Sequence, residues 1–255
     1  MQYIERRNVI MELITKDGFV RVSDLAKKFD VGDFTIRRDL KYLVQNFGIQ
    51  LAYGGAIAND SQMHKSISET KIAEKRTQNL EQKRLIAKKA AGLIEDGDTI
   101  ALNEGSTVEL ILDYIENLNS LNLITLSLNV AMKASTKPFI NVYMPGGKLR
   151  NESGAFYGSD AETFLEKFSV DKVFFGVVAV GIKSGVTHPV LEEVNVNRIL
   201  AKISRKIILV ADSSKFDKIS LVKMVPLEDF DTFVVDDDLP EAYRKYAELN
   251  NIDVI

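Results

Sequence analysis

The amino-acid sequence predicts an α/β protein in two parts: an N-terminal winged helix-turn-helix and a larger α/β domain with a mostly parallel sheet. The first observation is a pair of short helical segments joined by a brief turn, the second of which carries Arg37 and Arg38. The second is a glycine-containing segment, residues 48–56, with the length of a small hairpin. The third is the rest of the chain, where short apolar segments alternate with helical ones, as in a parallel sheet covered on both faces.

Composition excludes several classes of protein. The 255 residues include no cysteine, which excludes disulfides and thiolate metal sites, and the two histidines, His64 and His188, are too few for a histidine-based metal cluster. No run approaches the roughly 20 apolar residues that a membrane span needs. The first residues lack the apolar stretch of a signal peptide. We therefore expect a cytoplasmic protein that has no membrane partner, no metal and no cofactor.

The charge is distributed unevenly along the chain. The whole protein carries a net charge of −3, but residues 1–58 carry +2 and residues 59–255 carry −5. A weakly basic first part on an acidic second part is compatible with a DNA reader whose positive charge is local. Because the excess is small, we expect a homo-oligomer, a dimer or tetramer, to supply useful affinity.

The elements of the first part follow one another in a short space. Apolar residues at helical spacing predict a first helix that ends at a C-terminal glycine, Gly18. The expected elements after it are a strand over residues 19–22, a helix over 24–29, a turn at 30–32, a helix over about 33–46 and a hairpin, the wing, over 48–56. Gly54 and Gly55 mark the turn of that wing.

The helix over residues 33–46 has one apolar stripe and one basic face. Ile36, Leu40 and Leu43 fall at i, i+4 and i+7 and share the buried side. Polar side chains outside that stripe suit phosphate and base contacts in a DNA groove. The candidate DNA-binding residues are Phe34, Thr35, Arg37, Arg38, Lys41 and, from the wing, Tyr53. The alternative is a helical oligomerisation or protein-binding module, whose arginines would form an ordinary exposed face.

The second part is expected to begin after a polar segment. We predict three regions: a DNA-binding domain over residues 1–58, a linker over 59–72 and a larger domain over 73–255. A helix over about 69–94, broken near Asn79, opens the larger domain. Predicted strands cover 99–102, 123–127, 141–144, 172–178, 206–211 and 232–235, and predicted helices cover 108–117, 130–134, 155–167, 192–204 and 240–250.

Four loops at predicted strand ends carry small and polar residues. In an open α/β sheet such loops converge on one crevice, where backbone N–H groups, hydroxyls and a lysine suit a phosphate. The candidate ligand-binding residues are Asn103, Glu104, Gly105, Ser106, Thr107, Ser127, Asn129, Gly146, Gly147, Asp212 and Lys215. Each loop also has a simpler interpretation, as a helix cap, a tight turn or a solvated lysine.

Two further features receive structural interpretations. His188, beside Pro189, has the chemistry of a general base, but a lone loop histidine is usually surface decoration. Glu192 and Glu193 open a predicted helix, where carboxylates favour the helix dipole without any chemistry. We therefore assign no catalytic residue.

In combination, the motifs resemble those of the DeoR-type regulators of bacterial sugar metabolism. In the first part the matching segments are residues 5–7, 18–22, 24–26, 29, 31, 35–40, 43, 48 and 54–56. In the second they are Lys83 with residues 86–87, then 96–98, 105–107, 145–147, 185–187 and 211–216. The resemblance implies an effector domain with a fold similar to ribose-5-phosphate isomerase. It also implies a repressor of a sugar operon that binds duplex operator DNA and responds to a phosphorylated sugar.

The chain departs from the family pattern in three places. The serine expected after Val31 is Gly32, which weakens the helix cap. The wing usually carries an arginine and a histidine at the positions of Leu51 and Tyr53. The effector loop usually reads Asp-Ser-Gly-Thr-Thr, whereas this chain has Asn103-Glu104-Gly105-Ser106-Thr107. Glu104 thus adds a negative charge close to the expected phosphate.

An enzyme, a sugar-phosphate isomerase with an accessory head, is the alternative from another class. An isomerase needs a base at the substrate carbon, and Glu104 and Asp212 are the carboxylates available. A DNA-reading head has no use in such an enzyme, so we favour the regulator.

Overall fold

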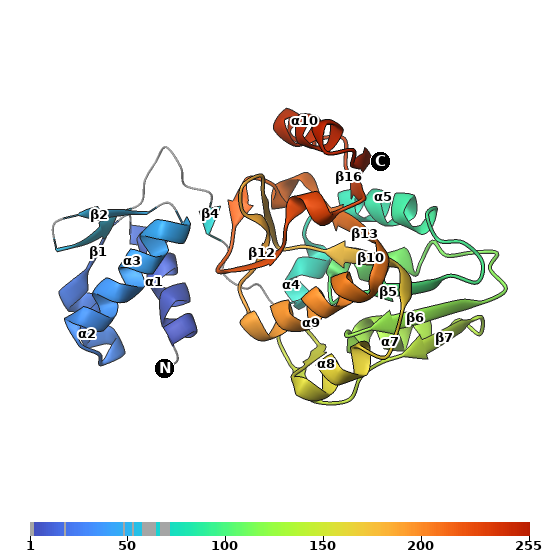
Figure 1. The fold of residues 1–255 in the computed structure, drawn as a ribbon, viewed down its shortest axis with the longest axis horizontal. Coiled ribbons are helices and arrows are strands. Elements are labelled where there is room, and N and C mark those ends of the chain that lie inside the picture. The colour runs from blue at the N-terminus through green and yellow to red at the C-terminus, as the bar shows by residue number, and fades with distance from the viewer. Residues whose placement is uncertain (1–2, 18, 48, 53, 58–64, 67–71) are drawn as a thin grey trace.

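The computed structural model describes residues 3–17, 19–47, 49–52, 54–57, 65–66 and 72–255. A small N-terminal head and a larger α/β body are distinct along the chain (Figure 1). The predicted fold class is therefore confirmed. None of the described helices combines the length and the apolar character that spanning a bilayer requires.

The head contains three helices and a three-stranded sheet. Its elements are α1 (Tyr3–Asp17), β1 (Phe19–Arg21), α2 (Val22–Phe29), α3 (Asp33–Phe47), β2 (Gln50–Ala52) and β3 (Gly55–Ile57). The sheet has the antiparallel order β1-β3-β2, so the predicted strand and wing join in one layer. Gly55 is required there, because a Cβ at this position would lie 1.9 Å from the carbonyl oxygen of Val20.

The body is built on seven parallel strands. Its helices are α4 (Ile72–Thr77), α5 (Leu80–Ala91), α6 (Ser106–Ile111), α7 (Leu128–Ala134), α8 (Ser159–Leu165), α9 (Leu191–Ile203) and α10 (Glu241–Leu249). The sheet runs β17 (Asp253–Val254), β16 (Thr232–Val235), β13 (Ser204–Ala211), β10 (Val170–Gly176), β5 (Thr99–Leu102), β6 (Leu121–Thr125) and β7 (Ile140–Tyr143). Every neighbouring pair in this order is parallel, as the alternation of strands and helices predicted.

Two hydrophobic cores cover the two faces of this sheet. Side chains of α5, α6 and α7 pack on one face, and side chains of α8, α9 and α10 pack on the other. Burial on both faces explains why the strands read as continuous apolar runs rather than alternating ones.

Short strands outside the main sheet complete the body. They are β8 (Lys148–Arg150) paired with β9 (Ala155–Tyr157), and a second sheet of β11 (Ala179–Gly181), β12 (Gly185–His188) and β15 (Val222–Val225). The predicted helix over residues 155–167 is wrong at its start, because Ala155–Tyr157 pairs with β8 and the helix begins only at Ser159. The predicted break at Asn79 is confirmed, since its φ of 50° interrupts the helix between α4 and α5.

Head and body also touch directly. Most of the predicted linker, residues 59–64 and 67–71, lies outside the described residues, but β4 (Lys65–Ser66) pairs with β14 (Lys218–Ile219) of the body. Leu221 is buried in the hydrophobic core of the head, and the Asn8 amide donates to the carbonyl oxygen of Pro189 at 3.4 Å.

Candidate functional site

Helix α3 presents a basic face to solvent. Ile36, Leu40 and Leu43 are fully buried in the head core, as the apolar stripe predicted. Several polar positions of the helix face outward. Phe34 is 80% exposed; Arg37, Arg38 and Lys41 are exposed, and Thr35 is half-buried. Tyr53, the sixth candidate DNA-binding residue, lies outside the described residues.

The acidic residue of this helix has a structural role. Asp39 is fully buried and accepts hydrogen bonds from Nε of Arg6 at 2.7 Å and from Nε of Arg7 at 2.8 Å. The guanidinium of Arg7 also lies 4.0 Å from the ring centroid of Tyr42. These contacts fix α1 against α3, so the arginines of α1 hold α3 in place rather than facing outward.

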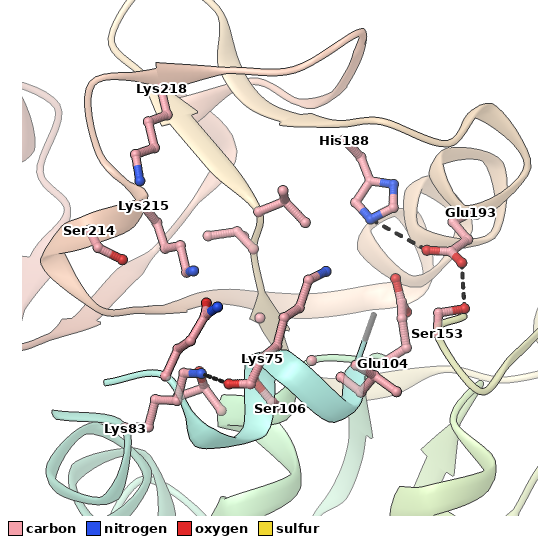
Figure 2. A pocket seen from close by; sticks show the side chains of 17 residues that line it. Lys75, Lys83, Glu104, Ser106, Ser153, His188, Glu193, Ser214, Lys215 and Lys218 are labelled. Atoms are coloured by element: carbon pink, nitrogen blue, oxygen red, sulfur yellow. Dashed lines mark hydrogen bonds and ion pairs between the residues drawn. The ribbon is translucent and has the colours of Figure 1, made fainter. Parts of the chain in front are cut away.

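The body contains a cavity of about 220 Å³ at the carboxyl ends of β5, β10 and β13. Figure 2 shows that its side chains form two groups, with Lys75 between them. Four lysines, Lys75, Lys83, Lys215 and Lys218, line the cavity. Glu104, Ser153, His188 and Glu193 lie together at the side away from Lys215 and Lys218.

Lys83 is the most deeply placed of the four lysines. It is 2% exposed, and its ammonium donates to the carbonyl oxygen of Lys75. Burial, followed by the positive charge of Lys215, lowers the pKa of Lys83 to about 8. Clustered amines that repel one another are stabilised by an anion, so this end of the cavity suits a phosphate.

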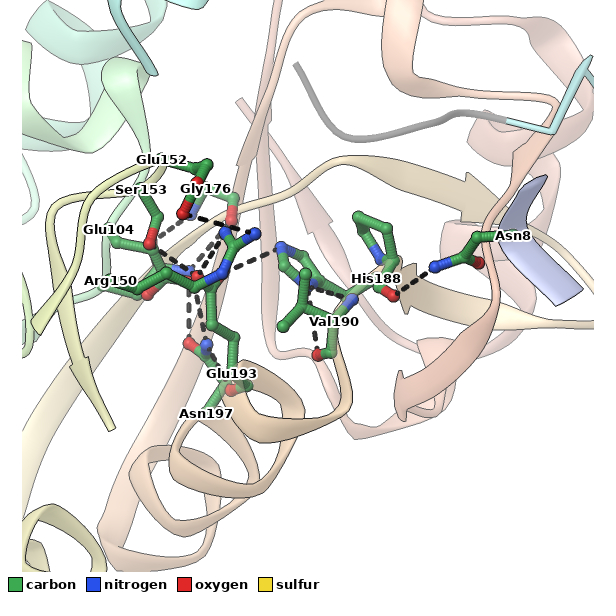
Figure 3. A network of polar contacts seen from close by, with 12 residues as sticks. Asn8, Glu104, Arg150, Glu152, Ser153, Gly176, His188, Val190, Glu193 and Asn197 are labelled. Atoms are coloured by element: carbon green, nitrogen blue, oxygen red, sulfur yellow. Dashed lines mark hydrogen bonds and ion pairs between the residues drawn. The ribbon is translucent and has the colours of Figure 1, made fainter. Parts of the chain in front are cut away.

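The opposite end of the cavity is acidic and almost fully buried. Glu193 accepts hydrogen bonds from Arg150 at 3.2 Å and from Ser153 at 2.5 Å, and its other oxygen lies 3.3 Å from Nε2 of His188 (Figure 3). Oε1 of Glu104 accepts from Asn197 at 3.0 Å. Burial and the charge of Glu193 raise the pKa of Glu104 to about 8.

Two candidate residues lie beneath the cavity and shape its loops. The Asn103 amide donates to the carbonyl of Gly176 and accepts from its N–H, both at 2.9 Å, which joins the ends of β5 and β10. Oδ1 of Asp212 accepts from Asn79 at 3.0 Å and from the N–H of Ser214 at 3.1 Å. Asp212 thereby shapes the 3₁₀ helix (Ser213–Lys215) that carries Lys215.

The structure brings together part of the predicted ligand-binding set. Glu104, Gly105, Ser106, Thr107 and Lys215 line the cavity. Asn103, Ser127, Asn129, Gly146, Gly147 and Asp212 do not. Ser127 instead accepts from the N–H of Val130 and caps α7.

Several cavity residues were not predicted from the sequence: Lys75, Lys83, Ser153, His188, Glu193, Ser214 and Lys218. The interpretation of His188 as surface decoration is wrong, because it is 7% exposed. The dipole interpretation of Glu193 is incomplete, because its carboxylate is buried among three side-chain partners. A serine–lysine run beside a strand was the available signal for Ser214, and the family resemblance that includes Lys83 was the available signal for that lysine. Lys75 had neither.

The chain is similar to bacterial repressors over nearly its whole length. The lactose phosphotransferase system repressor of Staphylococcus aureus (strain NCTC 8325) is 34% identical over 96% of this chain and 98% of its own. A chain of Escherichia coli O157:H7 provisionally named aga operon transcriptional repressor is 34% identical over 94% of this chain and 90% of its own. Ribose 5-phosphate isomerase A from Methanocaldococcus jannaschii has a TM-score of 0.41 and 21% identity over 54% of this chain and 55% of its own.

Family models match the same two parts that the structure separates. Residues 6–62 match the DeoR-like helix-turn-helix domain, and residues 78–237 match the DeoR C-terminal sensor domain. The chain belongs to the DeoR family, with its helix-turn-helix domain in the head and its sensor domain in the body.

Proposed function

We propose that this chain represses a sugar-utilisation operon, that α3 binds the operator, and that a phosphorylated sugar in the cavity of the body releases it. The observation that carries the proposal is the pairing, in one chain, of an exposed basic helix with a cavity on which four lysines converge. The names of the relatives, which are transcriptional repressors, support a regulator over an isomerase.

The DNA contacts are assigned to the exposed face of α3. Arg37 and Arg38 have the planar donors that recognise guanine edges or phosphates, and Lys41 and Thr35 suit backbone phosphates. Phe34 offers an apolar surface of the kind that contacts thymine methyl groups. Because the head carries a net charge of only +2, we infer that a homo-oligomer, a dimer or tetramer, places two heads on one operator.

The ligand is assigned to the cavity by charge and size. A phosphate dianion would offset the repulsion among the lysines, and Ser106, Thr107 and Ser214 add hydroxyl partners. The cavity, about 220 Å³, is smaller than the roughly 300 Å³ at which sites for drug-sized ligands begin. A single sugar ring with one phosphate suits such a space. The name of the staphylococcal relative supports a sugar operon.

In this proposal the DNA-binding domain covers residues 1–58, the linker covers 59–72 and the sensor domain covers 73–255. Residues 72–77 form α4, which carries Lys75 into the cavity. We therefore infer that the end of the linker belongs to the sensor.

Calorimetric titration of the full chain with glucose 6-phosphate, inorganic phosphate and glucose tests the ligand assignment. We expect the phosphates to bind and glucose to bind much more weakly. In Lys215→Ala, loss of one charged hydrogen bond, about 1.5–3 kcal/mol, should weaken phosphate binding roughly 10- to 150-fold. Lys167→Ala, an exposed position remote from the cavity lining, is the matched control. Equal affinity of wild type and Lys215→Ala would move the phosphate site elsewhere.

A further inference from the structure

One buried carboxylate oxygen of the cavity lining has no hydrogen-bond partner within the described part of the chain. Glu104 lines the cavity and is 9% exposed. Its Oε1 accepts a hydrogen bond from Asn197, whereas its Oε2 is buried and has no hydrogen-bond partner among the described residues. A buried acceptor without a partner costs about 1–3 kcal/mol, and more when it is charged. The charge of the nearby Lys75 attracts this carboxylate, but Oε2 still offers an acceptor that a proton, a cation or a ligand donor would satisfy.

The neighbouring groups are already engaged with one another. Arg150, Ser153 and His188 all contact the carboxylate of Glu193. Nδ1 of His188 lies 3.2 Å from the N–H of Val190 and 3.4 Å from its carbonyl oxygen, whereas Nε2 faces the carboxylate of Glu193 at 3.3 Å. A carboxylate oxygen only accepts, so the contact with Glu193 favours the proton on Nε2. Glu104 is thus the acidic group at this end that remains open to a ligand.

These contacts disfavour a metal ion, although Glu104, His188 and Glu193 offer ligand atoms within 4.8 Å of one another. A protonated Nε2 has no lone pair for a metal. Arg150, 3.2 Å from Glu193, would repel a divalent cation, and the metal would have to displace the serine and histidine contacts as well.

A ligand amine satisfies this end better than a hydroxyl does. A hydroxyl would donate one hydrogen bond to Oε2 but would do little to offset the cost of a negative charge buried beside Glu193, a cost that favours the protonated carboxyl. An ammonium would donate a charge-assisted bond and also neutralise that charge. The same molecule would need an anion at its other end, because Lys215 and Lys218 lie across the cavity (Figure 2).

We propose that Glu104 recognises a free amine on the effector, and that the effector is therefore an amino sugar phosphate rather than a neutral sugar phosphate. This inference rests on the proposed function, because it assumes that the phosphate binds at the lysines. Burial and the charge of Glu193 raise the pKa of Glu104, which agrees with a carboxyl that lacks its cation.

The test compares ligands that differ in one group. Calorimetric titration of the full chain uses glucosamine 6-phosphate against glucose 6-phosphate, and galactosamine 6-phosphate against galactose 6-phosphate. N-acetylglucosamine 6-phosphate, whose amine is uncharged, is the third arm. Of the two amino sugar phosphates, we expect the tighter ligand to bind wild type at least tenfold more tightly than the matching neutral sugar phosphate. The acetylated sugar phosphate should bind like the neutral one.

Glu104→Gln keeps the shape and removes the charge. It should reduce the preference for the amine to within about twofold while it still binds the neutral sugar phosphates. Glu116→Gln, at an exposed position, should keep the full preference. Thermal unfolding verifies that Glu104→Gln folds, and Glu104→Ser takes its place if it does not.

Each other outcome overturns a distinct claim. Binding of amine and hydroxyl forms with equal affinity overturns the amine inference and leaves sugar-phosphate sensing intact. A preference that survives in Glu104→Gln removes Glu104 from the role. Binding that requires added Mg²⁺ or Mn²⁺ and is lost with a chelator assigns Glu104 to a cation instead. Failure of every one of these phosphates to bind wild type overturns the proposed function itself.

Discussion

Arg38 is the residue on which DNA recognition most directly depends in this account. It is exposed on α3, beside Arg37, on a helix whose opposite face is buried. Replacement by alanine should weaken operator binding by about 1–3 kcal/mol, or roughly 5- to 150-fold, because a bidentate contact between arginine and a base contributes about that much binding free energy. Fluorescence anisotropy with labelled operator measures the change. Arg84→Ala removes another exposed arginine, on the body, and should bind like wild type; an equal loss in both variants would contradict a specific role.

Lys83 makes the affinity for a phosphate depend on pH. Its pKa is lowered to about 8 in the empty cavity, so it is charged below pH 8 and loses its charge above it. A bound phosphate raises that pKa, and binding above pH 8 therefore takes up a proton. We expect the affinity for glucose 6-phosphate to be nearly constant around pH 7 and to fall roughly tenfold by pH 9. The pH series is measured by calorimetry at constant ionic strength.

Lys83→Met is the comparison for this pH series. It keeps roughly the length of the side chain without the charge, so its affinity should be lower and should fall less than that of wild type between pH 7 and pH 9, where the remaining change comes from Glu104, whose pKa is also raised to about 8. If the affinity of Lys83→Met for glucose 6-phosphate falls between pH 7 and pH 9 as much as that of wild type, the titrating group is not Lys83.

At the scale of elements, the contact between α1 and α3 positions the recognition helix. Asp39 holds Arg6 and Arg7 inside the head, with side-chain exposures of 0%, 6% and 12%. Removal of one partner of a buried ion pair costs about 3–5 kcal/mol. Asp39→Asn should therefore raise amide hydrogen exchange throughout the head and leave the body unchanged. Asp24→Asn, at an exposed position of α2, is the control; unchanged exchange in Asp39→Asn would show that the ion pairs do not hold the head together.

The sequence predicted the elements that local patterns determine. The strand over residues 99–102 and the strand over 232–235 match β5 and β16 at both ends, because continuous apolar runs mark buried parallel strands. The predicted helix over 108–117 ends early, at Ile111, where i→i+3 hydrogen bonds from Asp113 and Tyr114 replace helical ones. The short strands β8 and β9, which pair with each other, escaped prediction because three residues each are too few to establish an alternating pattern.

The same distinction, between local patterns and contacts that are distant in sequence, explains which residues of the cavity were predicted. Glu104–Thr107 and Lys215 follow strands directly, so the convergence of parallel strand ends predicts their meeting. Lys83 lies on α5, and His188 and Glu193 lie on β12 and α9, which the topology brings to the cavity from elsewhere. A local sequence pattern does not reveal that these elements come together in the tertiary fold. For this reason the sequence alone indicated that His188 and the glutamates at the start of α9 were surface residues.

At the scale of the whole molecule, two short segments join the cavity to the head. Lys218 lines the cavity while Leu221, three residues on, is buried in the core of the head. His188 also lines the cavity, and the next residue, Pro189, accepts a hydrogen bond from Asn8. A ligand that shifts either segment would thus bias the placement of the head, provided that it favours one arrangement over the other.

Leu221→Ala tests this route. Typical coupling between two sites is about 1–3 kcal/mol, a 5- to 150-fold change in operator affinity when the ligand is bound. Loss of the buried leucine should reduce that factor toward 1, while affinity for the sugar phosphate alone stays within a few-fold of wild type. Anisotropy titrations with and without ligand measure the factor. Leu249→Ala, whose side chain is 83% exposed, is the control. A full response in Leu221→Ala would place the coupling elsewhere.

The most direct measurement is a footprint of the full chain at low salt on DNA upstream of its own gene, repeated with a sugar phosphate that calorimetry shows to bind. The account predicts a protected sequence that Arg38→Ala does not protect and that the bound sugar phosphate exposes again. A wild-type chain that protects no sequence, with or without the ligand, would contradict it.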